Sequence, residues 1–264
     1  MPRYDFRTAR IYLDAPLAAD RAVELGRDHA NYLLNVLRLK GGDDVLLFNG
    51  RDGEWRASLA SAGKRALTAV VGECLRSQPQ PPDLHFLFAP LKHARLDYLV
   101  QKAVEMGASR LQPVITRHTQ VARVNVERMR ANTIEAVQQC GILTLPEVAE
   151  PMAFDRAVGI ADADRLVVFC DEAAEVKDPL AALAAARPAA SALLPAEAAR
   201  AALPLAVLIG PEGGFSDEER AMLRKRPNVV RISLGPRILR ADTAAVAALA
   251  LVQAVLGDWR GGSA

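Results

Sequence analysis

Short apolar runs separated by turns and amphipathic stretches recur over most of the chain. Four of them are mainly apolar and short, as expected for strands buried on both faces: Leu84–Ala89, Leu111–Ile115, Leu166–Cys170 and Leu205–Ile209. Val229–Leu234 forms a fifth run. Helical patterns lie between these runs. The alternation of strands and helices predicts a parallel α/β sheet.

Two helices of this region have a clear apolar face. In the stretch Arg95–Met106, Leu96, Leu99 and Ala103 share one side, and Gly107 ends the helix. A longer helical pattern covers 126–139 and ends at Cys140-Gly141.

The first part of the chain has a different pattern. A short helix is expected at 29–39, followed by three strands at Val45–Phe48, Glu54–Leu59 and Leu67–Val71, with Asn-Gly and Asp-Gly turn signals between the first two. Short strands joined by tight turns predict a small β-barrel.

A proline-rich stretch, SQPQPP, follows the predicted barrel and is typical of a stiff linker. The sequence therefore predicts a β-barrel domain at 1–76, a linker at 77–82 and an α/β domain at 83–264.

Two glycine-rich turns follow the last two strands. Leu205–Ile209 runs into Gly210-Pro211-Glu212-Gly213-Gly214, and Val229–Leu234 runs into Gly235-Pro236-Arg237. Each turn leads into a helix. Ser216 and Glu219 form a capping-box pattern before the first, and Asp242 or Thr243 is the predicted N-cap of the second, an apolar run towards Leu256. Two consecutive strand-turn-helix units place both loops at one edge of the sheet, where ligands of open α/β folds bind.

Composition narrows the class of protein. The 264 residues suggest about two domains, and 51% hydrophobic with 24% charged residues is typical of a globular chain. A net charge of +2 does not by itself indicate nucleic-acid binding. The N-terminal residues lack the apolar core of a signal peptide, and no apolar run reaches membrane-spanning length, so a cytoplasmic protein without a membrane segment is expected.

The cysteines and histidines do not form a recognisable framework. Cys74, Cys140 and Cys170 are widely spaced, which favours reduced, buried thiols. The four histidines have no ligand-spaced partners, so no metal site is expected. The alanine-rich segment 173–204 is expected to form surface helices and loops, and to be the most mobile part of its domain.

The blocks GPEGGFSDEE and LGPRILRADTAA resemble the C-terminal signature of the SPOUT-class RNA methyltransferases. Within that class they are similar to the family that methylates N3 of a uridine (position 1498) in 16S ribosomal RNA. The resemblance extends to HANYLLNVLRLKGGD at His29–Asp43, LDYLVQKAVEMGAS at Leu96–Ser109 and EAVQQCG at Glu135–Gly141. It thus covers most of the chain.

This resemblance implies a PUA-like RNA-binding β-barrel followed by a SPOUT α/β domain with a C-terminal trefoil knot. It also implies S-adenosylmethionine as cofactor, a homodimer, and 16S rRNA of the small ribosomal subunit as partner. The loops after three strands would hold the cofactor, with these residues: Cys170, Asp171, Ile209, Gly210, Pro211, Glu212, Gly213, Gly214, Leu234, Gly235, Ile238, Leu239 and Arg240.

Methyl transfer to uracil N3 requires alignment with an already activated donor and loss of the N3 proton. Arg240 is the candidate catalytic cation that stabilises the developing anion. Asp242 is either a base or a helix N-cap, and Glu212 either contacts the cofactor's amino group or shapes the turn. Candidate RNA contacts are the basic residues Arg3, Arg7, Arg10, Arg38, Lys40, Lys92, Arg95 and Arg117.

Three other functions are weighed against this one. A SPOUT enzyme acting on a ribose 2′-hydroxyl or a tRNA base would have similar cofactor loops. A non-catalytic RNA-binding assembly factor could keep the fold without binding the cofactor. A phosphate-binding loop at GPEGG is disfavoured because the Lys-Ser/Thr of a P-loop is missing.

Overall fold

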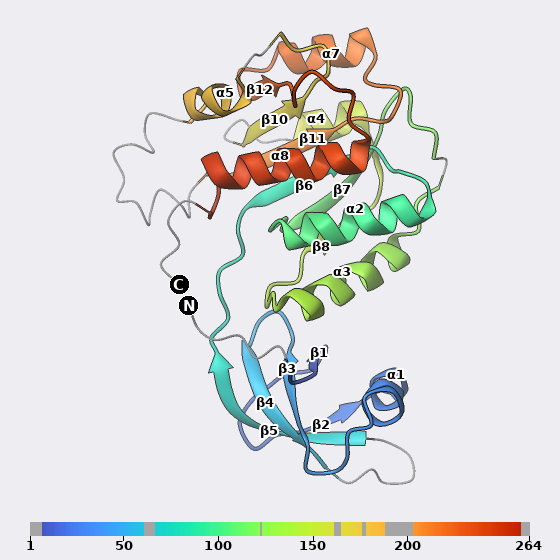
Figure 1. Ribbon diagram of the computed structural model, residues 1–264, viewed down its shortest axis with the longest axis vertical. Helices are drawn as coiled ribbons and strands as arrows, with labels where there is room; N and C mark the ends of the chain where they lie inside the picture. Colours follow the sequence, from blue (N-terminus) through green and yellow to red (C-terminus); the bar gives the residue numbers. More distant parts are fainter. Residues whose placement is uncertain are drawn as a thin grey trace. The chain divides into compact units, whose positions relative to one another are not determined.

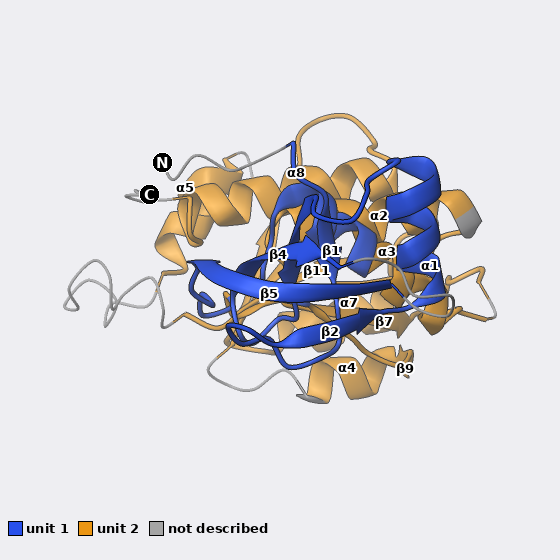
Figure 2. Cartoon of the chain, turned by 90° about the horizontal axis from the view of Figure 1, so that it is seen from below, with its two compact units in different colours: residues 1–81, 134–145 blue, residues 82–133, 146–264 orange. Residues whose placement is uncertain are grey.

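The computed structural model describes residues 7–60, 67–121, 123–160, 165–175, 178–187 and 203–259. The chain forms two compact units, one made of residues 1–81 and 134–145 and the other of 82–133 and 146–264 (Figure 2). The segment 134–145 therefore groups with the first unit, whereas the sequence analysis assigned it to a continuous second domain.

Hydrogen bonds show why this segment belongs to the first unit. The backbone N–H of Tyr12 donates to Oε1 of Gln138 at 2.8 Å. Arg76 Nη1 donates to the carbonyl oxygen of Gly141 at 3.0 Å. These bonds join positions that no local sequence pattern connects.

The first unit is built on one five-stranded sheet with strand order β1-β3-β4-β5-β2, in which β1 pairs in parallel with β3 and the other pairs are antiparallel. In the part of the unit that the structure describes, β1 and β2 are the edges, so the predicted small barrel is an open sheet there (Figure 1). Its elements are β1 (Arg10–Tyr12), β2 (Ala22–Leu25), α1 (Arg27–Asn31), the π-helical η1 (Tyr32–Val36), β3 (Asp44–Phe48), β4 (Glu54–Leu59) and β5 (Leu67–Arg76).

Arg10 lies inside this unit, so the structure argues against its predicted contact with an RNA phosphate. Its Nε donates to Oε1 of Glu54 at 2.6 Å, and the two side chains are only 6% and 4% exposed. Arg76 donates to the same carboxylate from Nε at 2.7 Å and from Nη2 at 2.9 Å. Burial raises the pKa of Glu54, but the hydrogen bonds and charges of Arg76 and Arg10 outweigh it and leave the pKa lowered.

The second unit contains a parallel sheet with strand order β12-β10-β11-β6-β7-β8, and β9 pairs with β7. The predicted parallel α/β sheet is confirmed. Its elements are β6 (Leu84–Phe88), α2 (His93–Glu105), β7 (Arg110–Ile115), α3 (Val126–Cys140, continuing into the first unit), β8 (Glu147–Val148), β9 (Met152–Ala153), α4 (Phe154–Ile160), β10 (Leu166–Cys170), α5 (Pro179–Ala185), β11 (Leu205–Ile209), α7 (Asp217–Arg224), β12 (Val229–Ile232) and α8 (Ala241–Val255).

Helices cover both faces of this sheet, as Figure 1 shows. On one face Val167, Phe169 and Leu208 pack with Phe154 of α4 and Leu223 of α7. Alternate strand residues point the other way, towards α8, which packs against β10, β11, α2 and α5. Burial on both faces explains why the strands are almost continuously apolar.

The capping box at the start of α7 is confirmed. The Ser216 hydroxyl accepts from the N–H of Glu219 at 3.3 Å, and the Glu219 carboxylate accepts from the N–H of Ser216 at 2.8 Å. The predicted cap of α8 is wrong. This helix begins at Ala241, so Arg240 is its N-cap residue and Asp242 lies inside the first turn.

Three further expectations meet the structure only in part. Cys74 and Cys140 are exposed, not buried as expected, and Cys170 is half-buried. In the alanine-rich segment, α5 is capped by Asp178 and buries Leu183 completely, so this part does pack. Residues 188–202 lie outside the described part of the chain, so the structure does not test the mobility expected of them.

No helix among the described residues has the length and apolarity needed to cross a membrane.

Candidate functional site

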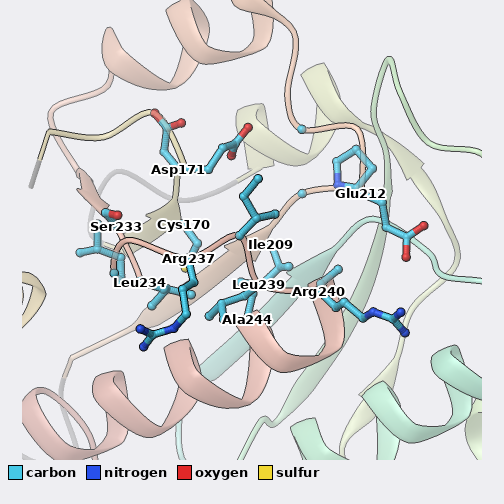
Figure 3. Close-up of a pocket in the computed structure, with 18 of the residues that line it drawn as sticks. Cys170, Asp171, Ile209, Glu212, Ser233, Leu234, Arg237, Leu239, Arg240 and Ala244 are labelled. Atoms are coloured by element: carbon cyan, nitrogen blue, oxygen red, sulfur yellow. The ribbon is translucent and has the colours of Figure 1, made fainter.

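Three loops meet at one edge of the second unit's sheet. They follow β10, β11 and β12, and these strands are neighbours because β10 pairs with both of the others. Because all three are parallel, their carboxyl ends lie together, and the loops enclose a cavity of about 560 Å³ (Figure 3). Its lining consists of Cys170, Asp171, Glu172, Ile209, Gly210, Pro211, Glu212, Gly213, Gly214, Ile232, Ser233, Leu234, Gly235, Pro236, Arg237, Ile238, Leu239, Arg240, Ala241 and Ala244.

Every residue named in the sequence analysis as cofactor-binding lines this cavity. The predicted set did not contain the other seven lining residues, which are Glu172, Ile232, Ser233, Pro236, Arg237, Ala241 and Ala244. The sequence analysis extended the strand to Leu234 and placed the helix N-cap at Asp242 or Thr243, whereas β12 ends at Ile232 and α8 begins at Ala241. Of the residues not predicted, Ile232 and Ser233 lie where β12 gives way to the loop, and Ala241 and Ala244 lie in the first turn of α8.

The glycines of the first loop allow close packing that no other residue permits. A Cβ on Gly210 would come within 2.4 Å of the Phe215 ring, and one on Gly214 within 2.4 Å of Oε1 of Glu172. Gly214 also has φ +70°, and Gly235 in the second loop has φ +99°. Both turns thus require the backbone freedom of glycine.

Asp171 is fully buried, and its carboxylate is the centre of an ion-pair cluster. Arg231 of β12 donates to Oδ2 from Nε at 3.0 Å and from Nη2 at 2.6 Å. Arg220 of α7 pairs with Oδ1 of Asp171 and also with Glu172. Because the carboxylate is already shared by two arginines, Asp171 shapes the wall of the cavity and its side chain is not available to a ligand.

Cys170 contributes a neutral thiol to the cavity wall. Burial raises its pKa to about 12. The thiolate is therefore absent at neutral pH, and the side chain acts as a small apolar surface.

Arg95 of α2 connects two carboxylates at the mouth of the cavity. Its Nε donates to Oδ2 of Asp242 at 3.0 Å and its Nη2 to Oδ1 at 3.2 Å, while Nη1 pairs with Glu212. The hydrogen bonds that Arg95 donates lower the pKa of Asp242. The same bonds to Asp242 and Glu212 raise the pKa of Arg95. In this structure the guanidinium of Arg95 is therefore paired with two carboxylates. Asp242 lies inside the first turn of α8 and not at its N-cap, as had been expected.

The second loop presents exposed side chains. Arg237 and Arg240 are both exposed and extend in different directions, with Arg240 on the side of Glu212 (Figure 3). Ile238, expected as an apolar wall, is 99% exposed in the single chain, so its side chain covers nothing there. Leu234 and Leu239 are half-buried and supply the apolar wall instead.

The remaining basic candidates are surface residues. Arg7, Arg38, Lys40, Lys92 and Arg117 are exposed, as an RNA contact requires, and Arg3 lies outside the described residues. Arg117 lines a second, more open hollow with His118, whose Nδ1 lies 3.1 Å from the carbonyl oxygen of Gly214. Within the described ranges, no group of three or more histidine, cysteine or acidic side chains is arranged to hold a metal ion.

Two domain families match this chain. Residues 78–253 match the RNA methyltransferase domain, and residues 25–72 match the RNA methyltransferase PUA domain. The first match contains the strands of the sheet that carries the cavity. The second match lies within the first unit, which is built on the five-stranded sheet.

Similar proteins span nearly the whole chain. Ribosomal RNA small subunit methyltransferase E of Rickettsia conorii is 32% identical over 249 residues, which are 92% of this chain and 94% of that protein. The protein of the same name from Bacillus subtilis is 26% identical over 85% of this chain and 87% of its own. A Legionella pneumophila structure, solved in complex with the bound cofactor SAM, aligns with a TM-score of 0.79 at 28% identity, covering 96% of this chain and 99% of that one.

Proposed function

The chain belongs to the RNA methyltransferase family that includes ribosomal RNA small subunit methyltransferase E, and on this premise we propose that it transfers a methyl group from S-adenosylmethionine to N3 of a uridine in 16S rRNA. The uridine corresponds to position 1498, the target of the family that the sequence resembles. The protein then acts in the cytoplasm, on the small ribosomal subunit.

The observation that carries this proposal is the cavity formed by three loops at the ends of β10, β11 and β12. Its volume of about 560 Å³ lies within the range of about 300–1,000 Å³ that is typical of small-molecule sites. The lining combines apolar side chains with two glycine turns, in which Gly214 and Gly235 have positive φ. These features fit a nucleoside with an amino-acid tail.

S-adenosylmethionine would supply an activated methyl group on a sulfonium, so the protein's main task is alignment. The backbone groups of 209–214 and 234–240 would hold the cofactor, with Leu234, Leu239 and Ala244 as its apolar contacts. The side chain of Cys170 would contact it as a neutral thiol, since the thiolate is absent at neutral pH.

Arg240 is the candidate for stabilising the uracil anion that forms as N3 loses its proton to solvent water. The side chain is exposed at the cavity and, unlike Arg95, has no ion pair among the described residues. Arg240 is the N-cap residue of α8, so its charge adds to the positive end of the helix dipole, and both favour a developing anion.

Two structural features belong to the same proposal. The loop 235–240 and α8 would pass through a preceding loop to form a trefoil knot, an arrangement that is rare in proteins. Two chains would pair through α8. In support, Val246, Leu251 and Val255 of this helix are only partly buried within the single chain.

Methyl transfer from labelled S-adenosylmethionine tests this function directly. The substrates are small subunits from cells that lack the protein, naked 16S rRNA and large subunits, and the modified nucleoside is identified by mass spectrometry. N3-methyluridine in the small subunit is the expected product. Label on a ribose, or label on large subunits alone, would contradict the target. Failure to bind the cofactor would favour an assembly factor without catalytic activity.

A further inference from the structure

Arg95 is the residue through which α2 contacts both sides of the cavity mouth. It lies in the first turn of this helix, and its side chain is 30% exposed. One partner, Glu212, belongs to the loop after β11, and the other, Asp242, to the first turn of α8. The guanidinium of Arg95 thus links α2 to the loop after β11 and to the start of α8.

We propose that Arg95 is a positioning residue, which fixes the loop of Glu212 and the N-terminal turn of α8 relative to each other, and that Asp242 is its anchor and not the acceptor of the N3 proton. The inference rests on the proposed function, because it assigns roles at the same site. It replaces the RNA contact that the sequence indicated for Arg95.

The hydrogen bonds of the guanidinium argue against an RNA contact. All three of its nitrogens donate to carboxylates: Nε and Nη2 to Asp242 and Nη1 to Glu212. One positive charge lies between two negative ones, so this cluster is net negative. A phosphate would meet repulsion there and would have to displace a carboxylate from Arg95.

The hydrogen bonds of Asp242 argue against a role as base. Its Oδ2 accepts from Arg95 Nε, and its Oδ1 accepts from Arg95 Nη2 and from the N–H of Thr243 at 2.8 Å. Because these donors stabilise the charged form, the pKa of this carboxyl is lowered. A carboxylate stabilised in this way is a weak acceptor for the N3 proton.

The positions of the two carboxylates, Asp242 and Glu212, explain how Arg95 would affect the reaction. Asp242 is two residues after Arg240, and Glu212 is two residues before Gly214. A shift of either carboxylate therefore moves the proposed catalytic cation or the glycine turn of the cofactor site. Displacements of about 1 Å can cost about 10²-fold in rate.

The decisive experiment compares Arg95→Ala, Arg95→Lys, Asp242→Ala and the double variant Arg95→Ala/Asp242→Ala. Cofactor affinity is measured by calorimetry without RNA, RNA affinity by filter binding between about 50 and about 200 mM salt, and kcat by methyl transfer. Unfolding midpoints of the cofactor-free proteins report on folding.

We expect Arg95→Ala to lower cofactor affinity and kcat by about tenfold or more, with RNA affinity and its salt dependence unchanged. Arg95→Lys should not rescue these losses, because an ammonium cannot donate along the same planar fork to both carboxylates. The double variant should resemble Arg95→Ala, since the two residues act as a unit.

Arg128→Ala is the matched control. Arg128 donates to Asp97 of α2 from Nε at 2.9 Å and from Nη2 at 2.6 Å, in the same paired geometry but outside the residues that line the cavity. It should leave cofactor affinity and kcat near those of the unmodified protein.

Two results would overturn the inference. One is a loss of RNA affinity in Arg95→Ala with a weaker salt dependence, restored by lysine, because that pattern identifies a phosphate contact. The other is an Asp242→Ala variant that loses far more activity than Arg95→Ala at equal cofactor affinity, as expected of a base. If the unmodified protein itself bound no cofactor, the proposed function would fail first, which keeps the two failures distinct.

Discussion

Arg231 donates two hydrogen bonds to a single oxygen of Asp171, Oδ2, from Nε at 3.0 Å and from Nη2 at 2.6 Å. The other oxygen of this fully buried carboxylate pairs with Arg220. The carboxyl end of β10, the end of β12 and helix α7 are thereby joined at one buried charge. The cluster thus ties the loop after β10 to β12, which leads into the loop 233–240, and to α7, which follows the loop 210–214.

Replacing Asp171 by alanine should destabilise the protein by about 3–5 kcal/mol, because two arginines would keep their charges beside an emptied, buried position. Urea unfolding followed by circular dichroism measures this change. Glu127→Ala is the control, since Glu127 pairs with Arg130 at the surface and its side chain is 81% exposed. That variant should cost no more than about 1 kcal/mol. Equal costs for both variants would contradict a structural role for the cluster.

Glu54→Gln should remove an acid-sensitive part of the stability of the first unit. The pKa of Glu54 is lowered from 4.5 in the folded protein, so the folded state favours the charged form. The contribution is fully present above about pH 4.5 and is lost as the pH falls through the lowered pKa.

Unfolding free energies measured from neutral pH down to about pH 3 test this expectation. The unmodified protein should be the more stable at neutral pH, and its advantage over Glu54→Gln should shrink as the pH falls. Glu127→Gln provides the exposed control, which should show no such convergence. A difference that stays constant over the whole range would rule out the lowered pKa.

Gly214→Ala should disturb the cavity in two ways. The residue has φ +70°, which L-residues rarely adopt, and the new Cβ would lie 2.4 Å from Oε1 of Glu172. A cost of about 1–2 kcal/mol in stability is expected from the φ angle alone, together with weaker cofactor binding.

Gly159→Ala is the matched control. Gly159 lies in α4, and a Cβ there meets no atom within 4 Å. Alanine should stabilise this helix by about 0.5–1 kcal/mol and leave cofactor binding unchanged. Cofactor affinity of both variants is measured by calorimetry. If Gly159→Ala bound the cofactor more weakly than Gly214→Ala, the assignment of the 210–214 turn to the cofactor site would be wrong.

Arg240→Ala should lower kcat by about 10²–10³-fold with little change in cofactor affinity, because a charge that acts on the developing anion contributes in the transition state. Arg237→Ala removes the same charge from the same loop in a different direction (Figure 3). It should affect RNA affinity more than kcat. If both variants lost only RNA affinity, Arg240 would be a phosphate contact.

The sequence by itself determined the local elements and the place of the cavity. Apolar runs of strand length, glycine-proline turns and the Ser216–Glu219 capping box depend on neighbours along the chain, and the structure shows them close to where they were expected. The order of strands and helices was also sufficient to place the loops after Leu205–Ile209 and Val229–Ile232 at one edge of a parallel sheet.

Only the tertiary structure decided which charged side chains meet. Arg10 and Arg95 are both arginines in apparently open stretches, yet one is buried against Glu54 and the other joins Asp242, 147 positions away. An arginine can be solvated, paired or bound to phosphate in the same local sequence, because its surroundings come from distant strands and helices. The partners of these charges, and with them the roles of Arg95 and Asp242, follow from how the chain packs.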